Sequence, residues 1–174
     1  MDKEYKTVEI KSNLELPYEL IRINEGSEQF GLYFKAFDEH QSDYSISAGG
    51  VTGVFEVAYS CLGVDCRFEC DITMGNLYSF YLQLENVYEC LPGIVPIATL
   101  DNYGSLDRSN LTFKFDKMGH VQVNGRFMNK DAHYSSGILF DVTMDAFYNI
   151  TYIINTLKSF FEELKRIQGH SNFF

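Results

Sequence analysis

Three of the four cysteines, Cys61, Cys66 and Cys70, lie within ten residues of one another, and the fourth is Cys90. Thiolates are favoured zinc ligands, and two nearby thiols can form a disulfide. Whether this spacing supports either chemistry depends on the local structure that positions the sulfur atoms.

The stretch GVDCRFECDI (63–72) alternates between apolar and charged residues, which is typical of a strand with one buried face. Strand residues rise ~3.3 Å each, so Cys66 and Cys70 are ~13 Å apart, too far for a shared zinc ion or a disulfide. Cys61 and Cys66 could meet across a hairpin, but a reducing cytosol disfavours that disulfide. We expect four free thiols, no metal and no cofactor.

Other residues with catalytic potential lack the spacing that catalysis needs. The glycines of SAGGVTG (47–53) precede a strand and lack the Lys-Ser/Thr of a phosphate-binding loop, and no G-x-S-x-G motif occurs. The histidines are scattered at His40, His120, His133 and His170. We therefore expect a protein that is not an enzyme.

The charged side of the 63–72 strand is the first candidate surface. We predict a hairpin with a type II′ turn at Leu62-Gly63-Val64-Asp65, in which Gly63 takes the first central position. This register places Cys61 opposite Cys66, Tyr59 opposite Phe68, Ser60 opposite Arg67, Ala58 opposite Glu69 and Glu56 opposite Asp71. Facing like charges are unfavourable. The charged side is either a solvated surface or an acidic patch for a basic partner, formed by Glu56, Asp65, Glu69 and Asp71.

Residues 74–91 have helical spacing and are followed by Pro92-Gly93, which ends a helix. The predicted core stripe contains Leu77, Phe80, Tyr81, Leu84, Tyr88 and Leu91. Beside it, apolar and acidic side chains are mixed as in a protein interface, which makes a second candidate surface of Tyr78, Leu82, Glu85 and Glu89.

The charge of the chain restricts its partners. The 174 residues include 14 Lys plus Arg and 24 Asp plus Glu, for a formal net charge of −10. Nucleic-acid binding requires a basic patch, so we expect no nucleic-acid partner, whereas an acidic surface would attract a basic protein. No apolar run is long enough to span a membrane and the first residues lack a signal region, so we expect a cytoplasmic protein without membrane contact.

The pattern predicts one domain over residues 1–174, of α+β class, with a largely antiparallel sheet of short hairpins and two helices packed on one face. Short strands are expected over 4–37, a polar loop over about 38–50, and further strands at 94–100, 111–115, 120–123 and 136–143, with Pro96 indicating a sheet edge. The last helix is expected over about 145–167, capped by Asp145. Its apolar stripe contains Phe147, Ile150, Ile153, Ile154, Leu157, Phe160, Phe161 and Leu164.

Residues 51–167 resemble the WapI-type immunity family of bacteria. The resemblance rests on the one-sided hairpin, the helix GNLYSFYLQLENVYE (75–89), the segment Tyr103-Gly104-Ser105-Leu106, the hairpin at 111–127 and ILFDVTMD (138–145) before the last helix. The family often has an Asp-Gln pair there, whereas here Asp145 is followed by Ala146. The resemblance implies a small cytosolic protein that binds and neutralises a toxin, with no catalytic residues.

Two functions from different classes remain open at this stage. The first is a non-catalytic immunity protein that binds a cognate bacterial toxin, which would be the basic partner. The second is a small-molecule-binding or enzymatic α+β domain with its pocket between helices and sheet. A buried polar residue in the core would favour the second.

Overall fold

The computed structural model describes residues 14–37, 50–100, 106–118, 120–128, 139–147 and 150–168. Within these residues the strands follow chain order in an antiparallel meander, interrupted by one helix and ended by another. The strands are β1 (Tyr18–Glu25), β2 (Glu28–Phe37), β3 (Thr52–Cys61), β4 (Val64–Thr73), β5 (Gly93–Leu100), β6 (Leu106–Phe115), β7 (His120–Met128) and β8 (Leu139–Phe147), and the helices are α2 (Met74–Glu89) and α3 (Ile150–Gln168). The predicted α+β class and antiparallel sheet are confirmed. Residues 4–13 of the predicted strands, and residues 38–49 of the polar loop predicted over about 38–50, lie outside the described residues.

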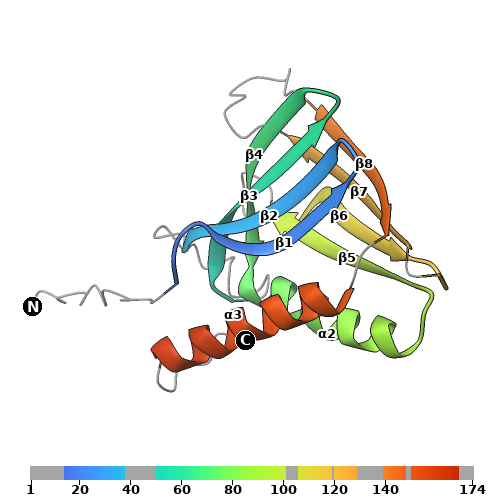
Figure 1. Cartoon of the computed structure of the whole chain (residues 1–174). Helices are drawn as coiled ribbons and strands as arrows, with labels where there is room; N and C mark the ends of the chain where they lie inside the picture. Colours follow the sequence, from blue (N-terminus) through green and yellow to red (C-terminus); the bar gives the residue numbers. More distant parts are fainter. Residues whose placement is uncertain are drawn as a thin grey trace, which may run out of the picture.

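The sheet curls around a single apolar core (Figure 1). Phe30 of β2 and Phe113 of β6 meet edge to face with ring centroids 6.0 Å apart, so the two halves of the meander face each other. Among the described residues, β4 and β5 are joined by one pair, Asp71 with Leu100, which separates β1–β4 from β5–β8. Pro96 pairs with Thr112 of β6 on one side of β5. On its other side, Pro96 faces the gap between β4 and β5, which agrees with the predicted position at a sheet edge.

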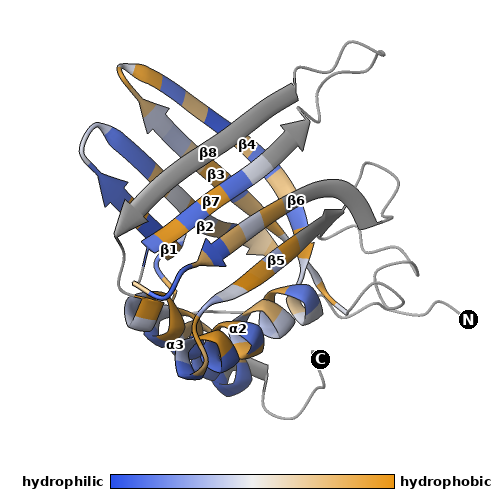
Figure 2. Ribbon diagram, turned by 90° about the vertical axis from the view of Figure 1, so that its right-hand side faces the viewer, coloured by the Kyte–Doolittle hydropathy of each residue, from blue (hydrophilic) through white to orange (hydrophobic). Residues whose placement is uncertain are grey.

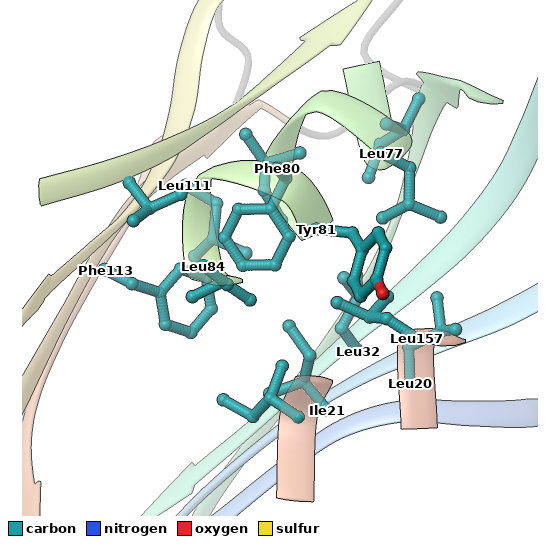
Figure 3. Close-up of a cluster of buried hydrophobic side chains, with 14 of the residues drawn as sticks. Leu20, Ile21, Leu32, Leu77, Phe80, Tyr81, Leu84, Leu111, Phe113 and Leu157 are labelled. Atoms are coloured by element: carbon teal, nitrogen blue, oxygen red, sulfur yellow. The ribbon is translucent and has the colours of Figure 1, made fainter. Parts of the chain in front are cut away.

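The helix α2 closes the core from one side. Thr73 caps its first turn by accepting a hydrogen bond from the backbone nitrogen of Asn76 at 3.2 Å. Leu77, Phe80, Tyr81 and Leu84 point into the core, where they meet residues of β1, β2, β6 and α3 (Figure 3).

One position of the predicted α2 stripe is wrong, because Tyr88 is 53% exposed. The core contact from the last turn is made by Val87, and Gly93 lies so close that a Cβ there would be 2.4 Å from Val87 Cγ2. The approach of β5 to Val87 therefore turns the neighbouring Tyr88 outward.

The helix α3 packs beside α2, across the same end of the curled sheet (Figure 1). The predicted stripe is buried at each of its helical positions, which are Ile150, Ile153, Ile154, Leu157, Phe160, Phe161 and Leu164. The predicted start is wrong. Asp145 pairs with Gln122 and Phe147 with His120, so both belong to β8, and the helix begins at Ile150. Backbone pairing with β7 prevails over the capping tendency of Asp145.

The hairpin of β3 and β4 has the predicted faces but not the predicted register. Cys61 pairs with Val64, so Leu62 and Gly63 alone form the turn, with φ of 49° and 83°. Two successive positive φ angles define a type I′ turn, whose twist matches that of the strands, and the predicted type II′ turn is wrong. Each pair moves by two residues, which preserves parity and therefore the inner and outer faces. The observed pairs include Tyr59 with Cys66, Val57 with Phe68, Ser60 with Asp65, Ala58 with Arg67, Glu56 with Glu69 and Val54 with Asp71.

The turn makes a stability prediction. Leucine is strained in the left-handed region, whereas asparagine enters it readily and Asn-Gly is a preferred type I′ pair. Leu62→Asn should raise the free energy of unfolding by about 1 kcal/mol in urea titrations followed by circular dichroism. Val64→Asn, at an exposed strand position, should give no such gain. A loss of stability in Leu62→Asn would contradict the type I′ turn.

Candidate binding surface on the outer face of β1–β4

The residues on the outer face of β1–β4 form three rows that cross all four strands, and most of them are polar. Figure 2 shows the alternation of apolar and polar residues along the described strands that separates this face from the core. The first row contains Glu19, Tyr33, Glu56 and Glu69, the second Arg22, Gly31, Ala58 and Arg67, and the third Asn24, Gln29, Ser60 and Asp65. An irregularity between Glu19 and Ile21 lets both Leu20 and Ile21 enter the core, so Glu19 and Arg22 emerge on the same outer face.

The centre of the second row is a hollow of about 280 Å³. Its floor contains Gly31 and Ala58, the smallest residues of this face, and Arg22 and Arg67 stand at its two ends. The Tyr33 ring lies over Gly31, where a Cβ would be 2.5 Å from Tyr33 Cε2. Only glycine at position 31 leaves room for this ring.

The acidic residues predicted on the hairpin do share this face, but two of them are engaged in ion pairs. Glu56 Oε1 accepts from Arg67 Nη1 at 2.8 Å, and Glu56 Oε2 lies 3.8 Å from Lys35 Nζ. Lys35 also donates to Glu69, which raises the pKa of the lysine. Lys35 and Arg67 thus offset the repulsion between Glu56 and Glu69, which face each other directly. Asp65 is exposed, and Asp71 is half-buried.

Sequence reasoning placed Arg67 on this face but missed its other two cations, Lys35 and Arg22. Lys35 and Arg22 come from β2 and β1, and their proximity to the hairpin depends on the pairing of β1 with β2 and of β2 with β3. The signal available in the sequence is the alternation of FGLYFKAF (30–37), which puts Tyr33 and Lys35 on the face of the strand away from Phe34.

Tyr33 is the aromatic residue that the outer-face rows contribute to the hollow. Partial burial raises the pKa of its phenol, as do Glu19 and Glu56, whereas Arg22 and Arg67 act in the opposite direction. The net shift is upward, so the phenol keeps its proton at neutral pH and can donate a hydrogen bond.

The second predicted surface, on α2, is partly used within the fold. Tyr78 is half-buried and packs edge to face on Phe161 at 5.0 Å, with Lys165 Nζ 5.9 Å from its ring centroid. Glu85 accepts a hydrogen bond from the Tyr81 hydroxyl at 2.5 Å. Burial, followed by this hydrogen bond, raises the pKa of Tyr81 to about 12.

Leu82 and Glu89 are the remaining members of the α2 surface, and both are exposed. They lie seven residues apart, on one flank of the helix. The structure therefore gathers all four predicted residues on that flank, but it leaves fewer of them available for a partner than the outer face of β1–β4 does.

The tip of the β3–β4 hairpin is an apolar feature that the sequence reasoning did not identify. Leu62 is 83% exposed and Val64 is 62% exposed. The signal in the sequence is a leucine before glycine in a short turn, where asparagine or aspartate is usual. We use "the tip" for Leu62 and Val64.

The cysteines are positioned as thiols. Cys61, Cys66, Cys70 and Cys90 are all free, and Cys61 Sγ lies 3.4 Å from Glu28 Oε1. In the part of the chain that the structure describes, no three His, Cys, Asp or Glu side chains gather as metal ligands would. Neither α2 nor α3 combines the length and apolar character that crossing a lipid bilayer would require.

Comparisons with protein-family models, with curated proteins and with solved structures find no match.

Two neighbouring residues of β4 test the division between the faces. Phe68 is buried and Arg67 is exposed on the other side of the strand. Phe68→Ala should lower the free energy of unfolding by about 3–5 kcal/mol, because it leaves a cavity in the core. Arg67→Ala should change it by roughly 0.5 kcal/mol at most, because exposed ion pairs contribute little. Similar losses in urea titrations of the two variants would show that the assignment of faces is wrong.

Proposed function

We propose that this chain is a non-catalytic protein-binding protein that acts in the cytoplasm as an immunity protein and neutralises a cognate bacterial toxin. The observation that supports this proposal most is the tip, where Leu62 is held in a strained turn and is exposed to solvent. The resemblance of residues 51–167 to WapI-type immunity proteins gives the proposal its biological class.

Within the described fold, the exposed Leu62 side chain makes no contact that would offset the free-energy cost of its strained backbone. A left-handed conformation costs a leucine about 1–2 kcal/mol, and this side chain is 83% exposed. Backbone strain of this kind is concentrated at functional positions. We infer that Leu62 is kept for a contact outside the chain.

The surroundings of the tip have the composition of a protein interface. Ser60, Asp65 and Arg67 follow directly on the outer face, so an apolar anchor is bordered by polar and charged groups. Interfaces typically combine an apolar centre with a polar rim, and a few buried anchors dominate their affinity.

The interior supports surface binding over the alternative function. Thr52 and Thr73 are the buried polar residues among those described, and Thr73 is the cap of α2. The remaining buried side chains of the described core are apolar, apart from Tyr81, whose hydroxyl bonds Glu85. A small-molecule site between helices and sheet would need convergent polar groups there.

The charge of the chain favours a basic partner. A net charge of −10 accelerates the approach of a positively charged domain. Exposed Asp65 lies directly beside the tip on β4, and exposed Glu69 lies further along the same face of the strand. Because Glu56 and Glu69 are paired with Lys35 and Arg67, such a partner would meet a surface of both positive and negative charges. A surface of this kind contributes more to selectivity between partners than to the rate of association.

The proposal is tested with the product of the gene beside the one that encodes this chain, using its C-terminal domain as the toxin. Wild type should restore growth of cells expressing that domain and should bind it in calorimetry. Leu62→Asn should bind about 10–100-fold more weakly, because a buried leucine contributes about 1.5–3 kcal/mol, although the variant folds at least as stably. Leu62→Met should retain most of the affinity.

The matched control is Met118→Ser. Met118 is 78% exposed on the turn between β6 and β7, so it is a second exposed apolar residue on a different hairpin. This variant should bind like wild type. No rescue by wild type would overturn the immunity function, and unchanged binding by Leu62→Asn would overturn the role of the tip.

A further inference from the structure

We propose that the hollow between Arg22 and Arg67 is a carboxylate-binding subsite that takes an acidic side chain of the protein partner. The identity of the donor as a protein rests on the proposed function, whereas the chemistry of the subsite is independent of it. The subsite would give the partner a second point of contact, close to the tip.

The spacing of the row suits a carboxylate. Arg22, Gly31, Ala58 and Arg67 pair successively across four strands, and neighbouring strands lie ~4.8 Å apart. The Cα atoms of the two arginines are therefore ~14 Å apart. Gly31 and Ala58 contribute no side chain beyond a Cβ between them, and the Tyr33 ring reaches over Gly31 from the neighbouring row. Two extended guanidinium groups can approach one carboxylate from opposite ends of this floor.

Each arginine has hydrogen-bond donors to spare. Arg22 Nη1 lies 3.5 Å from Glu19 Oε2, and Arg67 Nη1 lies 2.8 Å from Glu56 Oε1. A guanidinium carries five N–H donors in a planar fork, so one such bond leaves the others for a ligand. The side chains are 53% and 72% exposed, which allows both to turn toward the hollow.

Neutral groups complete the subsite. Asn24, Gln29 and Ser60 line one side and Tyr33 lies over Gly31 on the other. Amide and hydroxyl donors fix the orientation of a ligand whose charge the arginines recognise.

The acidic groups of the rim define the ligand further. Asp65 lines the hollow, and Glu19 and Glu56 each pair with one of the two arginines. Coulomb energy scales with charge, so a doubly charged phosphate is attracted by each arginine and repelled by each carboxylate about twice as strongly as a carboxylate ligand is. The three acidic groups outnumber the two arginines, so the summed charge disfavours the dianion more than the monoanion. The subsite therefore favours a singly charged anion.

The position of the hollow relative to the tip supports a protein source. Ala58 and Arg67 are each three residues from the pair Cys61–Val64 that closes the hairpin, which is ~10 Å along the strands. A partner that covers Leu62 can place a side chain into the hollow without a change in the fold.

The test uses N-acetyl-L-glutamic acid α-amide, which carries a single side-chain carboxylate, titrated into the intact 15N-labelled protein. We expect saturable shifts of the Arg22 and Arg67 side-chain N–H signals and of the Gly31 and Ala58 amides. The glutamine analogue, which has the same shape without the charge, should bind at least ten-fold more weakly, and so should inorganic phosphate.

Three variants locate the site. Arg22→Gln and Arg67→Gln should each weaken binding about ten-fold, because each removes one charge-assisted hydrogen bond to the carboxylate. Ala58→Val should also weaken binding at least ten-fold while keeping both charges, since it fills the floor and valine suits a strand. Arg166→Gln is the control, because Arg166 is an exposed arginine paired with Glu163 on α3, at 2.9 Å through Nε. It should bind like wild type.

Equal binding of the glutamine analogue, tighter binding of phosphate, or full affinity in the Arg22 and Arg67 variants would overturn the subsite. These outcomes are separate from failure of the immunity function, because the probe contains no toxin. Specific binding of the probe together with no rescue of growth would keep the subsite and reject the immunity role.

Discussion

The packing of Phe160 holds the two layers of this protein together. The centroid of its ring lies 5.2 Å from the ring centroid of Phe34 on β2, and 5.5 Å from those of Tyr18, just at the start of β1, and Phe161 on α3 itself. Phe161 in turn meets Tyr78 and Tyr81 of α2. These aromatic contacts fix both helices against the curled sheet and remove its inner face from solvent, so that polar chemistry on β1–β4 is confined to the outer face.

That confinement shapes what the outer face can do. The strand ladder sets the positions of Arg22, Gly31, Ala58 and Arg67 in one row, and the rigid core behind them keeps the row in register. The tip extends the same hairpin with Leu62 in a conformation that the backbone disfavours. An apolar anchor and a polar hollow therefore lie on one rigid support, which suits recognition of a protein surface without large rearrangement.

Much of the fold could be predicted because it depends on local periodicity. The α3 stripe, the hairpin faces and the first turn of α2 follow from side-chain spacing alone, since period and parity are properties of neighbouring residues. The hairpin register could not be fixed in the same way. Moving a pair by two residues leaves every side chain on its face, so the apolar pattern is equally satisfied by Tyr59 opposite Phe68 or opposite Cys66. The turn determines the register, because Leu62 adopts a left-handed conformation that its residue type did not indicate.

The candidate site was harder to predict because it is assembled from separate hairpins. Glu56 and Glu69 were visible as an acidic pair, but their partner Lys35 comes from β2, across the 38–49 segment of the chain. The hollow depends on the absence of side chains at Gly31 and Ala58 and on the Tyr33 ring, and such an absence has meaning only after strand pairing is known. Likewise Asp145 carried a capping signal that pairing with β7 overrode.

The account depends most directly on the sealing of the inner face, which a urea titration of Phe160→Ala tests. Phe160 is fully buried, so its loss should lower the free energy of unfolding by about 3–5 kcal/mol. Lys158→Ala, an exposed position on the same helix, should change it by roughly 0.5 kcal/mol at most. A loss below about 1 kcal/mol in Phe160→Ala would show that α3 does not close the core and would contradict the division between an apolar inner face and a polar outer face.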